Sequence, residues 1–174
     1  MMLIVFVCLC AGFSWMPIRN ALRDPTANKD YSTRWQTGLL VQRGGNLYPS
    51  DSPAKLPYMY PPFAALVGLP LGLVPFRVAG WLWTGLQLAL LWVSTGIAFR
   101  PFLDRYGHRR GLVQGVVAAV LVWTLPVAEG IRFGQVNHVI VALCLVDVAR
   151  RTPRLWPRGV LVGLAAAVKL TPGV

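Results

Sequence analysis

The stretch VAGWLWTGLQLALLWVSTGIAF, residues 78–99, decides how this sequence folds. Its 22 residues include no charge, and as an α-helix they span about 33 Å, which matches the hydrocarbon core of a bilayer at about 30 Å. Trp81 and Trp83 lie near one end and Arg100 follows the other, as is typical of side chains that anchor a helix at the two membrane interfaces. We therefore predict a transmembrane helix over 78–99.

The composition extends this prediction to the whole chain. Hydrophobic residues make up 55% of the 174 positions. Charged residues make up only 13%, against about 25% in an average soluble domain. The net charge is +11, but the basic residues fall in short clusters between uncharged runs. This pattern favours the loops of a membrane protein over a nucleic-acid-binding surface, so membrane lipid is an expected partner and nucleic acid is not.

Further uncharged runs compete for the membrane. Prolines interrupt one of them, 56–76, and remove backbone donors that lipid cannot replace, which favours a broken helix lying in or dipping into the interface. The lengths of the remaining runs predict an all-α, multi-pass transmembrane helical bundle with about five spanning helices, and interfacial helices in the first outer loop. The runs are 3–18, 56–76, 78–99, 111–128, 133–146 and 159–168.

We expect a single membrane domain over 1–174, which comprises a first helix (1–18), an outer loop with interfacial helices (19–77) and a helical bundle (78–174). The final predicted helix is short, since the 16 residues from 159 to 174 reach only about 24 Å as a helix, which is less than the bilayer core. The chain is therefore expected to be a fragment of a longer domain.

Loop charge separates two topologies, which differ in whether 56–76 crosses the bilayer. If it does not cross, two arginine clusters share one face, and the positive-inside rule places both in the cytoplasm. The first loop and the short loop at 129–137 then share the outer face. If 56–76 does cross, the first loop lies beside the arginine clusters. We prefer the first arrangement, because long loops are translocated largely regardless of charge. The clusters are Arg100, Arg105, Arg109, Arg110 and Arg150, Arg151, Arg154, Arg158.

Polar residues that lipid would exclude gather in three places. The first loop alternates aromatic residues and prolines with charges of both signs, as in NKDYSTRW at 28–35. Such a composition suits an interfacial wall around a polar ligand, although an ordinary loop also contains it. Gln135 and Asn137 either cap a predicted helix or, with Arg132, converge on a sugar or a phosphate. Lys169 follows ten uncharged residues, and a cation at such depth is usually functional or snorkelling.

Six features in a fixed order resemble one known family. An Asp near the start of the first outer loop is followed by GGNLY (44–48), YPPFAAL (60–66), WLW (81–83), RFGQVN (132–137) and LAAAVKLTP (164–172). Together they resemble glycosyltransferase family 87, the polyprenyl-phosphate-mannose-dependent α-mannosyltransferases of the GT-C class. The resemblance covers nearly the whole chain, as the N-terminal portion of such an enzyme.

The resemblance implies an incomplete GT-C-like bundle and an enzyme of the cell membrane. Such an enzyme moves a mannosyl or other hexosyl residue from a polyprenyl-phosphate donor to a glycan or glycolipid acceptor on the extracytoplasmic face. Enzymes of this class use an acidic residue of the first outer loop as base, and Asp30 occupies that position. Asp24 is the rival, but it precedes Pro25 in a turn-like stretch.

The chemistry fits these residue types. A sugar hydroxyl is a poor nucleophile and needs a general base, while a leaving lipid phosphate needs fixed cations. No metal or other cofactor is expected, because cations of the chain can hold the phosphate. The expected substrate-binding residues are Lys29, Arg34, Tyr60, Arg132, Gln135, Asn137 and Lys169.

Two other functions stay open. A small transporter or channel subunit would place Lys169 and Arg132 along a substrate path. A truncated, nonfunctional remnant or an assembly scaffold would insert into membranes without activity. Solute flux without sugar transfer would favour the transporter.

Overall fold

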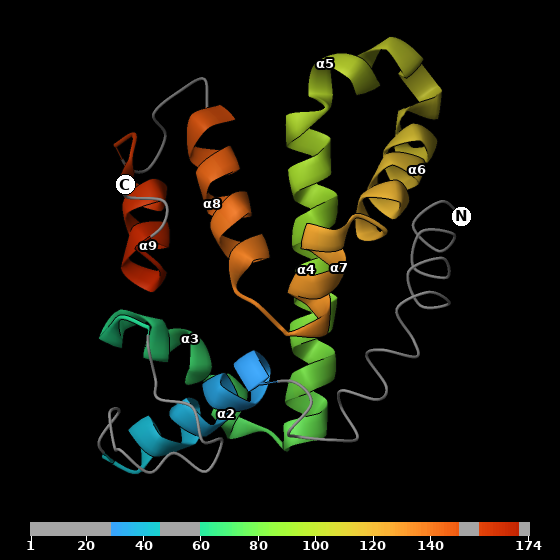
Figure 1. Cartoon of the computed structure of the whole chain (residues 1–174). Coiled ribbons are helices and arrows are strands. Elements are labelled where there is room, and N and C mark those ends of the chain that lie inside the picture. Colours follow the sequence, from blue (N-terminus) through green and yellow to red (C-terminus); the bar gives the residue numbers. More distant parts are fainter. Residues whose placement is uncertain (1–28, 46–59, 150–156, 171–174) are drawn as a thin grey trace.

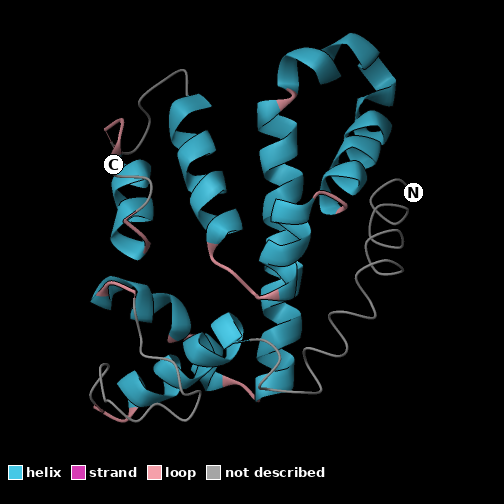
Figure 2. Cartoon of the chain, viewed as in Figure 1, coloured by secondary structure: helices cyan, strands magenta, loops and turns pink. Residues whose placement is uncertain are grey.

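The computed structural model describes residues 29–45, 60–149 and 157–170, and every regular element within them is helical. The prediction of an all-α chain is confirmed for these residues. One long upright helix, α4, stands at the centre, with shorter helices beside it and at its foot (Figure 1), and short loops join them (Figure 2). The predicted first helix at 1–18 lies outside the described residues.

Helix α4 (Phe76–Ala98) realises the predicted transmembrane run, shifted by about one residue at its end and two at its start. Pro75 precedes it, and the helix carries apolar side chains on all sides, which is typical of a helix in lipid. Trp81 is 45% exposed, as an interfacial anchor would be, but Trp83 is only 3% exposed. The prediction that Trp83 anchors the helix in the interface is therefore wrong, because positions two apart point to different sides of a helix.

The predicted helix at 111–128 is wrong, because the structure has two helices there. Helix α6 (Arg110–Val122) ends before Thr124, and α7 (Leu125–Arg132) starts at a bend of 75°. Pro126 in the first turn of α7 has no backbone N–H to continue the α6 hydrogen-bond ladder.

The number of spans is lower than the sequence predicts. Within the described residues, α4 alone is long and apolar enough to cross a membrane. The helical segments Arg100–Val122 and Leu125–Arg132 are bent relative to each other, and they give a second span only if the two segments together are taken as a single membrane crossing. The described part of the chain therefore does not confirm about five spans.

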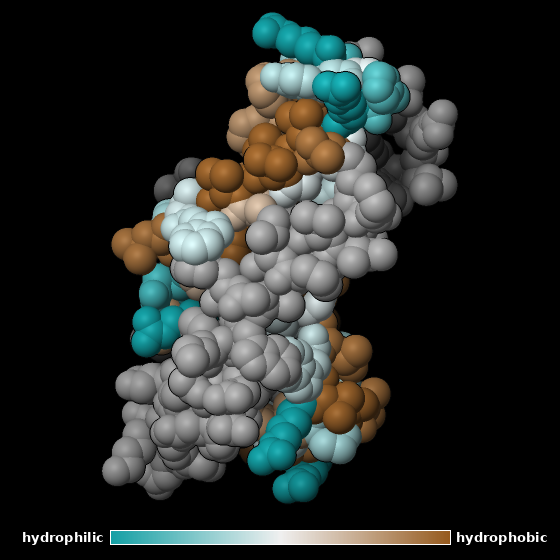
Figure 3. Space-filling view, turned by 90° about the vertical axis from the view of Figure 1, so that its right-hand side faces the viewer, coloured by the Kyte–Doolittle hydropathy of each residue, from teal (hydrophilic) through white to brown (hydrophobic). Residues whose placement is uncertain are grey.

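A polar corner joins α4 to α6. It consists of α5 (Arg100–Leu103) and η3 (Asp104–Arg109), and Asp104 pairs there with Arg110 at 2.7 Å and with Arg100 at 3.7 Å. In Figure 3 hydrophilic side chains cover the top of the molecule, where this corner lies, above a band of hydrophobic ones.

The foot of the molecule is built from short helices that pack backbone against backbone. The described part of the 56–76 run is broken into η1 (Pro62–Ala64), α3 (Ala65–Gly68) and η2 (Leu71–Leu73), as its prolines predict. Helix α2 (Lys29–Gln42) crosses them. A Cβ on Gly38 of α2 would lie 2.1 Å from the carbonyl oxygen of Gly68, so only glycine permits this approach.

Helices α8 (Asn137–Ala149) and α9 (Val160–Val168) complete the described fold. Helix α8 packs between α4 and α9 (Figure 1). It begins four residues later than the predicted run at 133–146, because 133–136 form a turn. Asp147, near the end of α8, is 3% exposed and accepts the backbone N–H groups of Gly159 at 2.8 Å and Val162 at 3.3 Å. This carboxylate caps the start of α9.

Candidate functional site

The turn between α7 and α8 places the predicted amide pair. Gly134 has a positive φ of 65°, and its N–H donates to the carbonyl of Ile131 at 3.0 Å. The N–H of Gln135 donates to the carbonyl of Gly130 at 2.8 Å. These two bonds form a Schellman motif, which needs a residue in the left-handed region and therefore favours glycine. The motif ends α7 and fixes the position of Gln135 just before α8.

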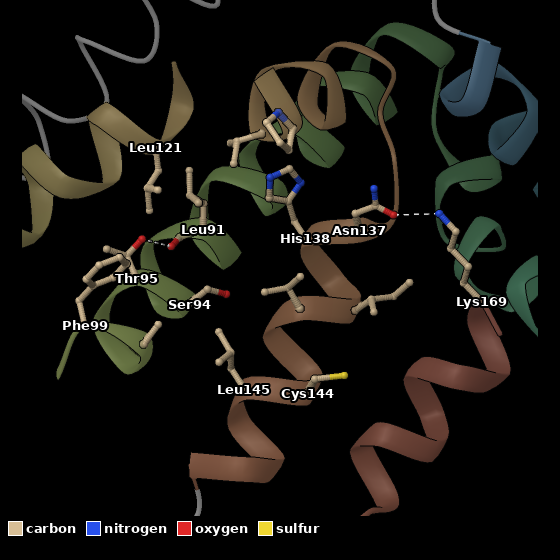
Figure 4. A pocket seen from close by; sticks show the side chains of 15 residues that line it. Leu91, Ser94, Thr95, Phe99, Leu121, Asn137, His138, Cys144, Leu145 and Lys169 are labelled. Atoms are coloured by element: carbon tan, nitrogen blue, oxygen red, sulfur yellow. Dashed lines mark hydrogen bonds between the residues drawn. The ribbon is translucent and has the colours of Figure 1, made fainter. Parts of the chain in front are cut away.

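Three predicted site residues meet at this turn, which we call the polar cluster: Gln135, Asn137 and Lys169. The side-chain oxygen of Gln135 accepts from Nδ2 of Asn137 at 2.6 Å. Nζ of Lys169, the residue that follows α9, donates to Oδ1 of Asn137 at 3.1 Å (Figure 4). The packing of α9 against α8 thus brings the cation to the amide pair.

Two further predicted residues lie next to this turn: Arg34 contacts the turn, and Tyr60 contacts Arg34. Arg34 of α2 is 5% exposed, and its guanidinium donates to the carbonyl of Gly134 and to the hydroxyl of Tyr60 at 3.4 Å. The guanidinium also lies over the rings of Tyr60, at 5.4 Å, and of Trp83, at 5.5 Å. Nε1 of Trp83 donates to the same Gly134 carbonyl at 2.9 Å. Side chains of α2 and α4 therefore both hydrogen-bond to Gly134, the residue that precedes Gln135.

Arg132 stands apart from the polar cluster. It is exposed at the last position of α7 and forms an ion pair with Glu129 at 3.1 Å. Its guanidinium also lies 5.4 Å from the centre of the Phe133 ring. These contacts leave it at the surface beside the turn.

The predicted base, Asp30, lies in the first turn of α2, next to Lys29. The side chains of both residues lie outside the described part of the structure. Asp30 comes one helical turn before Arg34. The predicted base therefore lies on α2, and Arg34 of the same helix hydrogen-bonds to the turn between α7 and α8.

Gln87 is a further buried residue of this region that was not among the predicted site residues. It is fully buried in α4 and touches the ring of His138, which is 8% exposed. The ring of His138 is closely packed, because a Cβ on Gly130 would lie 2.9 Å from its Cε1 atom. A lone amide inside the apolar run 78–99 is the signal that indicates Gln87.

A pocket of about 810 Å³ opens beside the polar cluster, between α4, the α6–α7 bend and α8 (Figure 4). Apolar side chains form most of its wall, among them Leu91 on α4 and Ile140 on α8. Asn137, His138 and Lys169 also line it, and these residues gather at the start of α8 and the end of α9. Ser94 and Thr95 of α4 are the other polar residues of the wall. The pocket is therefore mostly apolar, and its amide, imidazole and ammonium groups lie where it meets the cluster.

No group of three or more His, Cys, Asp or Glu side chains in the described ranges could hold a metal ion. What the arrangement offers is hydrogen-bond donors and a cation next to an apolar space. Such a site suits a ligand with one polar or anionic end.

The comparisons with known proteins agree on one family. The model of glycosyltransferase family 87 matches residues 58–174. A protein of Mycolicibacterium smegmatis named polyprenol-phosphate-mannose-dependent alpha-(1-2)-phosphatidylinositol mannoside mannosyltransferase is 35% identical over 152 residues, 80% of this chain and 34% of that protein. The protein of the same name from Mycobacterium tuberculosis is 36% identical, over 80% of this chain and 35% of its own length.

A third relative differs from the first two in the acceptor that its name gives. It is a Mycolicibacterium smegmatis protein named polyprenol-phosphate-mannose-dependent alpha-(1-2)-phosphatidylinositol pentamannoside mannosyltransferase, 41% identical over 68% of this chain and 28% of that protein. The chain spans about a third of the length of these curated relatives. No solved structure matches it. The family model covers more than half of the chain, and the matched range includes the three residues of the polar cluster, so the chain belongs to glycosyltransferase family 87.

Proposed function

We propose that this chain is part of an integral-membrane glycosyltransferase that moves a mannosyl residue from a polyprenyl-phosphate donor to a glycan or glycolipid acceptor. The observation that carries the proposal is the meeting of Lys169 with Asn137 and Gln135 at the polar end of an apolar pocket. The names of the relatives, which use polyprenol-phosphate-mannose and act on phosphatidylinositol mannosides, support the same donor and a glycolipid acceptor.

Lys169 is the proposed ligand of the donor phosphate. Its ammonium group has three N–H donors, and Asn137 receives one of them. The remaining donors can bind phosphate oxygens, and a charged bond of this kind strengthens as the leaving phosphate gains charge. Arg132, exposed at the end of α7, and Lys29, in the first turn of α2, are the proposed additional cations on the substrate side.

Asp30 is the proposed general base. In the transfer step the bond between the anomeric carbon and the phosphate oxygen breaks, and the phosphate keeps the electron pair. The acceptor hydroxyl forms the new glycosidic bond and gives its proton to the Asp30 carboxylate. Arg34 and Tyr60 contribute by holding α2 against the turn that carries Gln135. Asp24 remains the rival base and lies outside the described residues.

We also propose a multi-pass topology with the transfer site on the extracytoplasmic face. The arginines of the α5–η3 corner support this orientation, because positively charged loops stay in the cytoplasm. Labelling of cysteines introduced in 105–110 and near position 46 with an impermeant reagent tests it. The two sites should label from opposite faces, and labelling from one face would contradict the topology.

The test of the function is Lys169→Met in the intact protein that contains this chain. Transfer of mannose from decaprenyl-phosphate mannose to a phosphatidylinositol mannoside should fall about 10²-fold or more, as when a fixed donor to a developing anion is removed. Lys169→Arg should retain more activity, and Arg43→Met, which removes an exposed cation at the far end of α2, should retain all of it. Equal activity of Lys169→Met and the wild type would exclude the proposed phosphate site.

The relatives' names give no support to the transporter alternative. A measurement of solute flux in proteoliposomes still separates the two functions, because a transporter would move a polar solute without any sugar transfer.

A further inference from the structure

We propose that the pocket between α4, α7 and α8 binds the first isoprene units of a polyprenyl phosphate, and that His138 donates a hydrogen bond from Nε2 to the phosphate end. This inference rests on the proposed function and adds a residue and a place for the lipid that the sequence analysis did not assign. Four observations carry it: the orientation of the Gln87 amide, the resulting tautomer of His138, the burial of that ring and the chemistry of the pocket wall.

The Gln87 amide has only one orientation that satisfies its neighbours. The carbonyl oxygen of Gly130 can only accept a hydrogen bond, so the NH2 group of Gln87 must face it, at 3.2 Å. Nε1 of Trp83 can only donate, so the amide oxygen and not the NH2 group must face it, at 3.0 Å. The single N–H of Trp83 is then shared between this oxygen and the carbonyl oxygen of Gly134, at 2.9 Å. Because Gln87 is fully buried, water cannot rescue the opposite orientation.

This orientation assigns the tautomer of His138. The same NH2 group lies 3.1 Å from Nδ1 of His138 and donates to it, so Nδ1 carries no proton. A neutral imidazole then carries its proton on Nε2. In this orientation of the amide, protonation of Nδ1 would set two donors face to face in a buried place, which disfavours the doubly protonated ring.

The Nε2–H group has no hydrogen-bond partner within 29–45, 60–149 and 157–170. The ring is 8% exposed and lines the pocket, where it lies between α8 and α4 (Figure 4). Gly130 leaves the space that the ring occupies. A buried donor without a partner is unfavourable, which favours an acceptor atom supplied by a ligand in this pocket.

The pocket wall defines the ligand as an amphiphile with one anionic end. Apolar side chains form most of the wall of a space of about 810 Å³, enough for a few isoprene units. Ser94 and Thr95 of α4 add hydroxyl groups to this wall, and the Thr95 hydroxyl donates to the carbonyl of Leu91. The amide, imidazole and ammonium groups gather at one end. There the His138 donor is adjacent in sequence to Asn137, which holds the Lys169 ammonium. His138 and Lys169 line the same pocket, so the oxygens of one phosphate are the proposed acceptors of both groups, while the chain attached to the phosphate follows the apolar wall along α8.

Cys144 offers a direct readout of occupancy. It lines the pocket on α8, six residues after His138, which is about 9 Å along the helix. In the intact protein with Cys8→Ser and Cys10→Ser, and with any other cysteines replaced likewise, we would measure the rate of Cys144 modification by N-ethylmaleimide in liposomes. Decaprenyl phosphate without sugar should slow the modification. Decaprenol should protect much less, and mannose 1-phosphate should not protect.

Variants of His138 test its donor. His138→Leu should raise the decaprenyl phosphate concentration for half-protection about tenfold, because a charge-assisted hydrogen bond is lost. His138→Gln, whose amide nitrogen reaches the position of Nε2, should restore protection better than His138→Asn, whose amide reaches only the position of Nδ1. Nitrogen-15 spectra of the labelled ring should show the Nε2–H tautomer in the wild type.

The outcomes separate this inference from the proposed function. Absence of protection by decaprenyl phosphate in a protein that still transfers mannose would overturn the lipid site and leave the function intact. Protection without transfer activity would support the site and count against the function. Equal protection by hexadecyl phosphate would overturn the isoprenoid assignment, and an unchanged half-protection concentration in His138→Leu would overturn the role of Nε2.

Discussion

The two ends of α9 are both held to α8 by polar side chains, but they differ in what those side chains leave available. At the start of α9 the Asp147 carboxylate is 3% exposed and accepts two backbone N–H groups, of Gly159 and Val162. At the end of α9 the half-buried Lys169 ammonium donates to Asn137 and borders a pocket. The comparison teaches that the capped end stabilises the helix pair, while the end at the pocket keeps donors for a ligand.

The largest expected effect comes from the proposed base on α2, the helix that Arg34 joins to the turn beside the pocket. Asp30→Asn in the intact protein should lower the rate of mannose transfer by about 10²- to 10⁴-fold, the usual contribution of a general base. Membrane insertion and the unfolding temperature should stay as in the wild type, because the substitution is isosteric. Transfer rates from decaprenyl-phosphate mannose check this prediction. A large loss in Asp24→Asn together with full activity in Asp30→Asn would move the base to the rival residue.

The next largest effect is expected from removal of the hydrogen bond that holds Lys169 at the end of α9. Asn137→Leu removes the acceptor of Lys169 and the donor to Gln135, so the ammonium loses its fixed position. We expect kcat/KM for the donor to fall about 10²-fold, a loss typical of a misplaced electrostatic group. Asn137→Asp is the matched variant, because it keeps an acceptor for Lys169 but adds a negative charge near the phosphate. It should weaken donor binding, seen as a higher KM.

The capped end should respond in stability and not in chemistry. Asp147→Ala removes the cap of α9 and should lower the free energy of unfolding by about 1–2 kcal/mol. Thermal unfolding in detergent measures the shift. Well below the unfolding temperature, transfer by the folded fraction should stay close to the wild-type rate. A specific loss of activity without a loss of stability would show that the two ends of α9 are not separate in function.

The smallest effect concerns the exposed cation. Arg132→Gln breaks an ion pair with Glu129 whose arginine side chain is 58% exposed. Because exposed charges are screened by salt, we expect transfer to fall less than about tenfold, and the difference from the wild type to shrink as ionic strength rises. Rates measured across a series of salt concentrations check this. A loss as large as that of Lys169→Met would place Arg132 directly on the phosphate.

The runs of uncharged residues predicted that helices form better than they predicted where the helices end and how they pack. The run 78–99 became α4 with small shifts of its bounds, because helix hydrogen bonds join residues four apart and depend on the local sequence. The runs 111–128 and 133–146 gave wrong bounds. Pro126 and the turn around Gly134 break the helices there, and a count of uncharged residues does not register such breaks.

The candidate site was predictable as residue types but not as a geometry. Gln135, Asn137 and Lys169 were singled out because polar groups beside or within apolar runs are costly. The sequence did not indicate that Arg34 would reach the carbonyl of Gly134, because the two residues lie 100 positions apart. Nor did it indicate His138 as more than a packed residue, because its role depends on the orientation of a buried amide on another helix.

The sequence by itself determined that the chain is helical, that it suits a membrane, and that its motifs resemble those of a glycosyltransferase family. These properties follow from composition, from hydrophobic run length and from the order of short motifs, all of which are local. Only the tertiary structure decided which cation meets the amide pair and where the apolar pocket lies. Lys169 and Asn137 are separated by 32 positions, and their contact depends on the packing of α9 against α8, which no local pattern specifies.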